Sequence, residues 1–387
     1  MERRKIYLDN AATTPVNERV YDAISDYYRK NFYNPSANYT PAYNIAKEIE
    51  RTRKTLATYI GCKPEEIFFT SGASESNSWA IQGWLRSHSA GYVVTTNIEH
   101  HSIMAISEDP YYESNICVIG VDDDGILHEA NLQTVLEEVR GWGVQPDDIL
   151  VAIQTANNEI GTIQPIYDLA RITKNFGAHF FTDATQAFAG IDMEKFLVSS
   201  NIDMMSMSGH KIGAPKGVGF LYKSKDIELP PLIYGTQNYG LRGGTENVPA
   251  IIAMYYALQH IDIVKSRFCN VEQARDKLFE ELNKITPIKM NGSKEHRLPN
   301  NLNITFEKEI IGTTIMAVLS ALDVYISVGS ACNAQTSEPS HVLTAIGLSE
   351  DEALRTIRIT LPDDANIESV SPIAYRFKTA IELLLRE

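Results

Sequence analysis

Cysteine is scarce in this chain of 387 residues, and no long apolar run is present. The four cysteines are scattered, and no two have the CxxC spacing of a redox or zinc motif. A disulfide framework is therefore excluded. No stretch approaches the about 18 consecutive apolar residues of a transmembrane helix, and the basic first residues lead into no signal-peptide core. These absences predict a cytoplasmic protein that does not span a membrane.

Positive charge is also in short supply. Lys and Arg together number 35 against 49 for Asp and Glu, so the formal net charge is −14. A protein that binds nucleic acid by neutralising phosphates normally carries the opposite sign, so direct nucleic-acid binding is excluded as a general function. Disorder is excluded as well, because 44% of the residues are hydrophobic and the chain can bury one large core or two modest ones.

Short β-rich runs alternate with helical patterns through the first two thirds of the chain. Helical periodicity between the runs, for example over 130–140 and 166–176, predicts strand–helix–strand units. Such units build a mostly parallel α/β sheet that is covered on both faces. The predicted strands are 66–70, 92–95, 116–120, 149–153, 179–182, 204–206 and 218–222.

The pattern changes at about residue 247, where a long helical stretch begins that is predicted to reach about residue 285. The pattern after it is typical of a smaller α+β domain, which the N-terminal segment 7–15 is expected to join. We predict a large domain over 15–255 and a small domain over 1–14 and 256–387. The later elements predicted are strands at 301–306, 325–328 and 356–360 and helices at 311–322 and 367–384.

Polar residues lie directly after the predicted strands, where an α/β sheet binds its ligands. Residues 70–77 open a helix with Gly and small hydroxyl residues, a pattern that binds a phosphate or only caps the helix. Lys211, beside Ser208 and His210, is either a candidate Schiff-base lysine or a lysine at a surface turn. Asp183 ends a strand, either as a helix cap or as a carboxylate paired with a cationic ring nitrogen.

Two further polar segments, 155–161 and 99–101, also follow strands. Adjacent histidines point apart and no third ligand lies at a recognisable spacing, so no metal site is expected. Together the five strand ends supply a phosphate cradle, a lysine, a carboxylate, an amide and an aromatic ring. This set predicts a pocket for pyridoxal phosphate (PLP), in which Lys211 holds the aldehyde, Asp183 keeps the pyridine nitrogen protonated and His100 stacks on the ring.

Cys332 differs from the other cysteines. It lies in a polar loop of small residues, where a thiol is expected to be exposed and free to act as a thiolate. Cys62, Cys117 and Cys269 lie in or beside apolar or helical segments and are expected to be structural, as small buried side chains. Arg358, on a late strand, is a candidate to bind an amino-acid carboxylate through two hydrogen bonds, with a structural salt bridge as the alternative.

These segments, taken in order, resemble the NifS/IscS-type cysteine desulfurases of the class V aminotransferase fold. The resemblance implies the type I fold of PLP-dependent transferases, with a large, mostly parallel sheet domain and a smaller α+β domain. It runs from residues 7–15 to Arg358 and is carried by five motifs: Thr-Ser-Gly-Ala-Ser-Glu-Ser-Asn (70–77), Asn-Asn-Glu-Ile-Gly (157–161), Asp-Ala-Thr-Gln (183–186), Ser-Gly-His-Lys (208–211) and Gly-Ser-Ala-Cys (329–332).

The resemblance also implies roles for single residues. Asp183 and Gln186 would contact the pyridine nitrogen and the phenolic oxygen of PLP. The catalytic residues implied are Cys332, Lys211 and His100. The cofactor-binding residues implied are Lys211, Asp183, Gln186, His100, Ala73, Ser74, Asn158, Ser208, His210 and, from the partner subunit of a homodimer, Thr245. The residues implied to contact L-cysteine are Arg358, Asn34 and Asn158.

The implied activity is conversion of L-cysteine to L-alanine, with the sulfur left as a persulfide on Cys332. The sulfur would pass to an acceptor protein in iron–sulfur cluster assembly or in thio-modification of nucleic acid. A selenocysteine lyase, or another class V enzyme such as an aminotransferase, is the alternative among enzymes. A non-catalytic sulfur-delivery scaffold is the alternative of another class, and the presence of Lys211, Asp183 and His100 argues against it.

One segment departs from the family pattern. The family usually has a Gly-rich run before its Arg-x-Gly-Thr motif, whereas this chain reads Tyr-Gly-Thr-Gln-Asn-Tyr at 234–239. We therefore expect subunit contacts or partner recognition near this loop to differ, and the chemistry to be retained.

Overall fold

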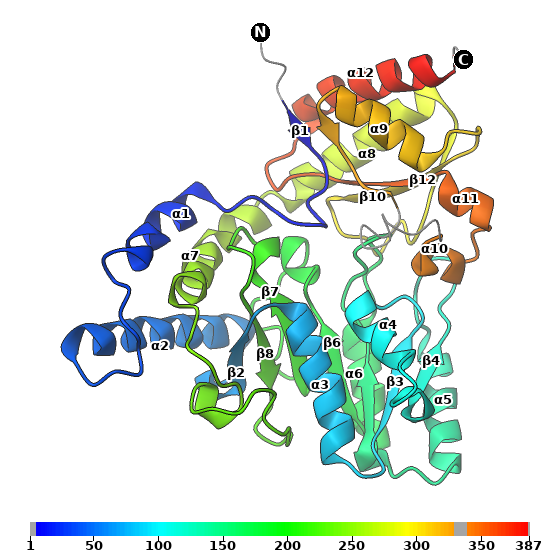
Figure 1. The fold of residues 1–387 in the computed structure, drawn as a ribbon. Helices are drawn as coiled ribbons and strands as arrows, with labels where there is room; N and C mark the ends of the chain where they lie inside the picture. The colour runs from blue at the N-terminus through cyan, green and yellow to red at the C-terminus, as the bar shows by residue number, and fades with distance from the viewer. Residues whose placement is uncertain (1–4, 329–338, 386–387) are drawn as a thin grey trace.

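A computed structural model describes residues 5–328 and 339–385 (Figure 1). Cys332 and the Gly-Ser-Ala-Cys motif lie outside the described residues. Within the described part of the chain, no helix is both long enough and apolar enough to cross a membrane.

A seven-stranded sheet forms the larger part of the molecule, and its mostly parallel order confirms the predicted α/β class. The adjacent strands β4, β3, β5, β6 and β7 run parallel to one another. Strand β8 runs antiparallel to both of its neighbours, β7 and β2. In spatial order, the strands are β2 (Ile67–Thr70), β8 (Gly219–Lys223), β7 (Met204–Ser208), β6 (His179–Asp183), β5 (Ile149–Ala152), β3 (Tyr92–Thr96) and β4 (Ile116–Ile119).

Helices cover both faces of this sheet (Figure 1). Along β5, Ile149 and Val151 belong to one apolar cluster, and Leu150 and Ala152 belong to the cluster on the opposite face. This alternation follows from the two-residue period of a strand. One face packs against α3 (Ala73–Ser87) and α4 (His101–Ser107), and the other against α2 (Thr40–Ile60), α5 (Glu129–Gly141), α6 (Ile166–Phe176) and α7 (Val248–Lys265).

The smaller part of the molecule is built on a three-stranded antiparallel sheet in the order β12-β10-β9. A short parallel pair, β1 with β11, brings the N-terminal segment to this part, as the sequence predicts. The elements are β9 (Ile288–Met290), β10 (Asn301–Phe306), β12 (Thr356–Thr360), β1 (Ile6–Tyr7), β11 (Val324–Tyr325), α8 (Phe268–Ile285), α9 (Gly312–Ala321), α10 (His341–Ala345), α11 (Glu350–Leu354) and α12 (Ile367–Leu384).

The long helical stretch predicted over 247–285 is two helices, because α7 ends at Lys265 and α8 begins at Phe268. Tertiary packing is the cause of this break between the two helices. Helix α7 packs against α1 (Glu18–Ile24) and α2 in the larger part, whereas α8 packs against α12 in the smaller part. The division of the chain at 14/15 and 255/256 stays a prediction. Short 3-10 helices complete the fold at η1 (Ser25–Tyr28), η2 (Pro64–Glu66), η3 (Glu113–Asn115), η4 (Pro146–Asp148), η5 (Ala187–Ala189), η6 (Gly209–Lys211) and η7 (Asn238–Gly240).

Candidate active site

A cavity of about 420 Å³ lies where the carboxyl ends of β2, β3, β5, β6 and β7 meet. Asn34 and Thr245 are exposed and do not line this cavity. The structure nevertheless brings together most of the residues singled out in the sequence, and their roles stay predictions. The predicted residues that line the cavity are Ala73, Ser74, His100, Asn158, Asp183, Gln186, Ser208, His210, Lys211 and Arg358.

The Asp183 carboxylate is held at the end of β6, where the residue is only 6% exposed. Asn77 Nδ2 donates to Asp183 Oδ2 at 2.7 Å, and the Thr185 amide donates to Asp183 Oδ1 at 2.9 Å. Asn77 Nδ2 also donates to Ser102 Oγ at 2.9 Å, and Ser102 Oγ lies 2.9 Å from His100 Nδ1. Asn77 and Ser102 thus join the carboxylate to the imidazole, a link that the sequence analysis missed.

The His100 ring is held in one orientation by this network. Its Nδ1 accepts a hydrogen bond from the Ser102 amide at 3.1 Å, so the ring proton of the neutral form is assigned to Nε2. Burial lowers the pKa of His100, and the positive charge of Lys211 adds to the decrease, while Asp183 opposes it. The ring is therefore neutral near pH 7.

Lys211 lies in η6, directly after β7, and reaches the N-terminal segment of the chain. Its Nζ donates to the carbonyl oxygen of Ala12 at 2.8 Å and to that of Ala11. Gln186 Nε2 donates to the same Ala11 carbonyl at 3.0 Å. Burial, followed by the charges of Lys211 and Lys216, lowers the pKa of the neighbouring His210 to about 4. The N-terminal segment therefore closes one side of the cavity.

The amino end of α3 forms another wall. The first backbone N–H groups of a helix have no intrahelical acceptor, and the helix dipole is positive at this end. Residues 71–75 all line the cavity. Gly219, the first residue of strand β8, lies against this helix end: a Cβ on Gly219 would come within 2.7 Å of Gly72 Cα. The wall is thus shaped for an anion, and Gly219 cannot be replaced without moving it.

Arg358 is buried on β12 at 1% exposure. Its Nη2 donates to Asp9 Oδ1 at 2.7 Å, and its Nη1 donates to the Asn158 carbonyl at 3.1 Å. Arg358 Nε is buried and has no hydrogen-bond partner among the described residues. The salt bridge considered as an alternative is present, and the guanidinium still lines the cavity. Binding of a substrate carboxylate stays a prediction.

Two buried carboxylates at the rim were missed in the sequence. Glu99 accepts hydrogen bonds from Thr96 Oγ1 at 2.6 Å and from the Gln154 amide at 3.0 Å, and burial raises its pKa to about 8. Glu159, at 2% exposure, accepts a hydrogen bond from Ser340 Oγ at 2.5 Å. Both carboxylates follow predicted strands, and this position was the available signal.

The remaining cysteines differ from one another. Burial raises the pKa of Cys62 to about 12 and raises that of Cys117. Cys269 is exposed on α8, so the expectation of a buried structural thiol is wrong for this residue. It lies on the solvent face of an amphipathic helix, which the apolar content of the stretch concealed. Among residues 5–328 and 339–385, no group of three His, Cys, Asp or Glu side chains is arranged to hold a metal ion.

Comparison with known proteins places this site in a family. The family described as Aminotransferase class-V matches residues 6–371. The chain belongs to the class V aminotransferases. A relative, cysteine desulfurase IscS of Methanosarcina thermophila, is 38% identical over 370 residues, which cover 93% of this chain and 88% of the relative.

Solved structures share the fold over nearly the whole chain. One described as a NifS-like protein superposes with a TM-score of 0.86 at 30% identity and covers 98% of this chain and 100% of its own. Another, described as SspA in complex with cysteine, has a TM-score of 0.79 at 36% identity and covers 94% of this chain and 100% of its own. These likenesses confirm the family and the fold that the sequence motifs implied.

Proposed function

We propose that the protein is a PLP-dependent cysteine desulfurase that converts L-cysteine to L-alanine and leaves the sulfur as a persulfide on Cys332. One observation carries the proposal: a lysine, a buried carboxylate and the amino end of a helix converge on one cavity. Relatives of this class V chain carry the name cysteine desulfurase, and one neighbour is described with cysteine bound. These names favour desulfuration over selenocysteine lysis or amino-group transfer.

The residues around the cavity fit PLP. The buried Asp183 carboxylate suits a protonated pyridine nitrogen, because a buried anion needs a cationic partner or several donors. The amino end of α3, with Ala73 and Ser74, suits the phosphate, joined by Ser208 and His210. Lys211 supplies the amine for the aldehyde, and His100 supplies a neutral ring to stack on the pyridine.

When bound, PLP supplies an electron-withdrawing ring that stabilises negative charge at the substrate Cα. Asp183 holds a proton on the ring nitrogen, and its bonds from Asn77 and Thr185 keep it oriented. The Lys211 amine would take the proton from the substrate Cα. Arg358 orients the substrate carboxylate from the opposite wall.

Sulfur transfer then requires the Cys332 thiolate. An unperturbed thiol has a pKa of about 8.5, so only a small fraction is thiolate at neutral pH unless a nearby cation lowers it. The thiolate forms a bond to the substrate sulfur as the Cβ–S bond breaks, and the bonding electrons stay with the three-carbon fragment. That fragment takes up protons and leaves as alanine. The persulfide would pass to a sulfur-acceptor protein.

The proposal includes a homodimer in which Thr245 reaches the phosphate of the partner subunit. Several exposed aromatic side chains on the segment from α1 to α2 support it, because aromatic residues are enriched at protein–protein interfaces. Light scattering on the purified protein tests the oligomeric state. The exposed aromatic residues on the segment from α1 to α2 are Tyr21, Tyr28, Phe32, Tyr39 and Tyr43, each at least 50% exposed.

The test of function mixes cofactor-loaded protein with L-cysteine and a dithiol and measures alanine and sulfide. Equal amounts of both products in the wild type, and neither in Cys332→Ala, are expected. Lys211→Ala is expected to lose the visible absorbance of the lysine-bound cofactor. Product formation by Cys332→Ala at the wild-type rate would refute the role of the thiol. A wild type with no such absorbance would refute the cofactor assignment.

A further inference from the structure

Residues 233–247, which include the segment 234–239 that departs from the family pattern, double back on themselves between β8 and α7. The Gly243 amide donates to the Ile233 carbonyl at 2.8 Å, and the Gly244 amide donates to Gln237 Oε1 at 3.0 Å. A Cβ on Gly243 would lie 2.6 Å from Gly235 Cα, so the two arms of the loop meet where neither has a side chain. The loop is therefore a compact unit that can be fixed at a few points.

Asn238 fixes the loop to the sheet. It is 7% exposed, and its Oδ1 accepts a hydrogen bond from the Phe69 amide at 3.2 Å on β2. Its Nδ2 donates to the Arg242 carbonyl at 3.2 Å. Strand β2 leads directly into α3, so the loop is attached to the element that carries the anion-binding helix end.

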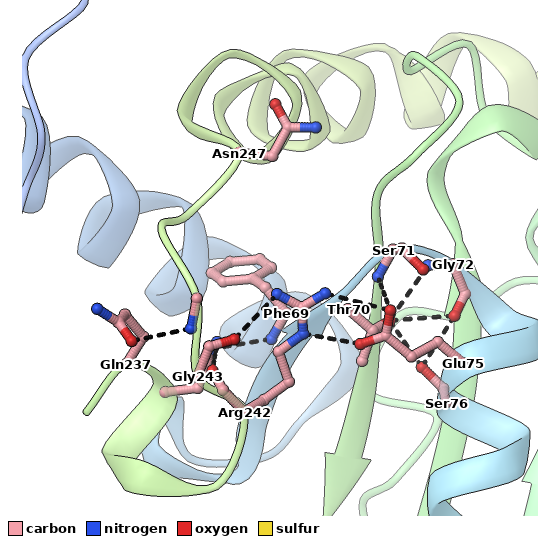
Figure 2. A network of polar contacts seen from close by, with 12 residues as sticks. Phe69, Thr70, Ser71, Gly72, Glu75, Ser76, Gln237, Arg242, Gly243 and Asn247 are labelled. Atoms are coloured by element: carbon pink, nitrogen blue, oxygen red, sulfur yellow. Dashed lines mark hydrogen bonds and ion pairs between the residues drawn. The ribbon is translucent and has the colours of Figure 1, made fainter. Parts of the chain in front are cut away.

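Arg242 makes the second attachment, at the helix itself (Figure 2). Its Nε donates to Glu75 Oε1 at 2.7 Å and its Nη2 to Glu75 Oε2 at 3.2 Å, a bidentate pair with side chains only 20% and 17% exposed. Glu75 is the third residue of α3 and also accepts the Ser71 amide at 3.0 Å. Burial raises the pKa of Glu75, but the bonds from Arg242 and Ser71 outweigh it and hold the pKa below its ordinary value.

The Glu75 carboxylate is therefore an anion in the wall where a phosphate is expected. Glu75 lines the cavity together with Ser71 and Ser74. Arg242 does not line the cavity and lies behind Glu75. Like charges a few ångström apart repel strongly where water is scarce. Lys211 and Lys216 line the same cavity, but no ion pair joins either of them to Glu75 in the described part of the chain.

We propose that Arg242 is a positioning residue for phosphate binding, which neutralises Glu75 and holds it against the loop so that the amino end of α3 can accept the phosphate of PLP. The inference rests on the proposed function and adds to it. Glu75 secures the first turn of α3 through Ser71, and Arg242 cancels the charge that this bond brings into the wall. The loop at 233–247 thereby keeps a contact with the cofactor site through Arg242, which lies outside the departing segment 234–239.

The test measures PLP affinity by titrating cofactor-free protein and recording absorbance. Arg242→Ala is expected to weaken PLP binding by about tenfold to hundredfold, because an unpaired carboxylate is left beside the phosphate. Arg242→Gln, which keeps a donor and removes the charge, is expected to do the same. Adding Glu75→Gln to Arg242→Ala is expected to restore affinity to within about threefold of the wild type. Arg171→Ala, which breaks an exposed pair with Asp168, is the matched control and should change nothing.

Pyridoxal, which lacks the phosphate, separates the charge effect from a structural one. Its affinity is expected to be the same in Arg242→Ala and the wild type, and inorganic phosphate is expected to compete with PLP less well in Arg242→Ala. Equal weakening of pyridoxal and PLP, or a double variant as weak as Arg242→Ala, would overturn the inference. Failure of the proposed activity has a different signature, because a wild type that binds PLP and makes no alanine still gives the same ranking of variants.

Discussion

Ser340 offers a sharp test of how the rim of the cavity is held. It is the N-cap of α10, where its Oγ accepts the Val342 and Leu343 amides at 3.2 and 3.4 Å. The same hydroxyl donates to Glu159 Oε2 at 2.5 Å. Ser340 and Glu159 are 5% and 2% exposed, so neither is well solvated by water. Ser340→Ala therefore removes a helix cap and a donor to a buried carboxylate at once.

The expected cost is the sum of these two losses. Removing an N-cap hydroxyl costs about 1 kcal/mol. Leaving a buried charged acceptor without its donor costs about 1.5–3 kcal/mol. Ser340→Ala should therefore lower the free energy of unfolding by about 2.5–4 kcal/mol.

The chain supplies a matched control. Ser349 caps α11, a helix of the same five-residue length, and accepts the Glu352 amide at 3.3 Å, but it is exposed. Ser349→Ala is expected to cost only about 0.5–1 kcal/mol. In a Glu159→Gln background the buried charge is gone, so Ser340→Ala should then cost about as much as Ser349→Ala.

Urea unfolding of the wild type and the four variants, followed by circular dichroism, measures these costs as shifts of the midpoint at unchanged slope. Equal shifts for Ser340→Ala and Ser349→Ala in the wild-type background would refute the reasoning, because they would show that the bond to Glu159 contributes nothing. A cost of Ser340→Ala that persists in the Glu159→Gln background would show that the buried charge is not its source.

Three further predictions concern other parts of the molecule. Between pH 6.5 and about 4, His210 is neutral in the folded, cofactor-free protein and takes up a proton when the chain unfolds, so the free energy of unfolding decreases as the pH falls through this range. The urea midpoint of His210→Asn should depend less on pH there. Asn238→Ala leaves the buried Phe69 amide without its acceptor and should cost about 1–3 kcal/mol; an unchanged urea midpoint would contradict this. Iodoacetamide should alkylate exposed Cys269 in the native protein and spare Cys62, whose thiol pKa is about 12; peptide mass spectrometry reads both.

Much of the sheet could be predicted from local pattern, because buried strands of a parallel sheet are short continuous apolar runs. The predicted strand 116–120 is β4 (Ile116–Ile119), and 92–95 is β3 (Tyr92–Thr96). The direction of a strand within the sheet was harder to predict from the sequence. Nothing in the run 218–222 distinguishes a parallel from an antiparallel strand, and the reversal of β8 follows from the tight return after η6. The break after Lys265 carries no Gly or Pro, so only the change of packing partner reveals it.

The candidate site was predictable to the extent that it follows strand ends, since ligands of such sheets bind there. This rule found Asp183, Lys211 and His100. It could not find Asn77, whose amide joins Asp183 to the Ser102 hydroxyl, because this contact depends on how α3 and α4 pack together. Partners from distant segments, such as the Asp9 carboxylate on Arg358, are likewise fixed by topology alone.

The motif at 157–161 shows why a polar segment after a strand need not be wholly a ligand site. Its Asn158 carbonyl accepts Arg358, and its Glu159 carbonyl accepts Asn301 and Asn303, so the smaller sheet is bonded directly to a wall of the cavity. Gly161 has a φ of +75°, and a Cβ there would lie 2.6 Å from the Asn301 side chain, so both conformation and space require glycine. Two backbone carbonyls of the motif thus join it to the smaller sheet. Because the junction and the cavity share one segment, a substitution that shifts β10 also moves the wall at Asn158.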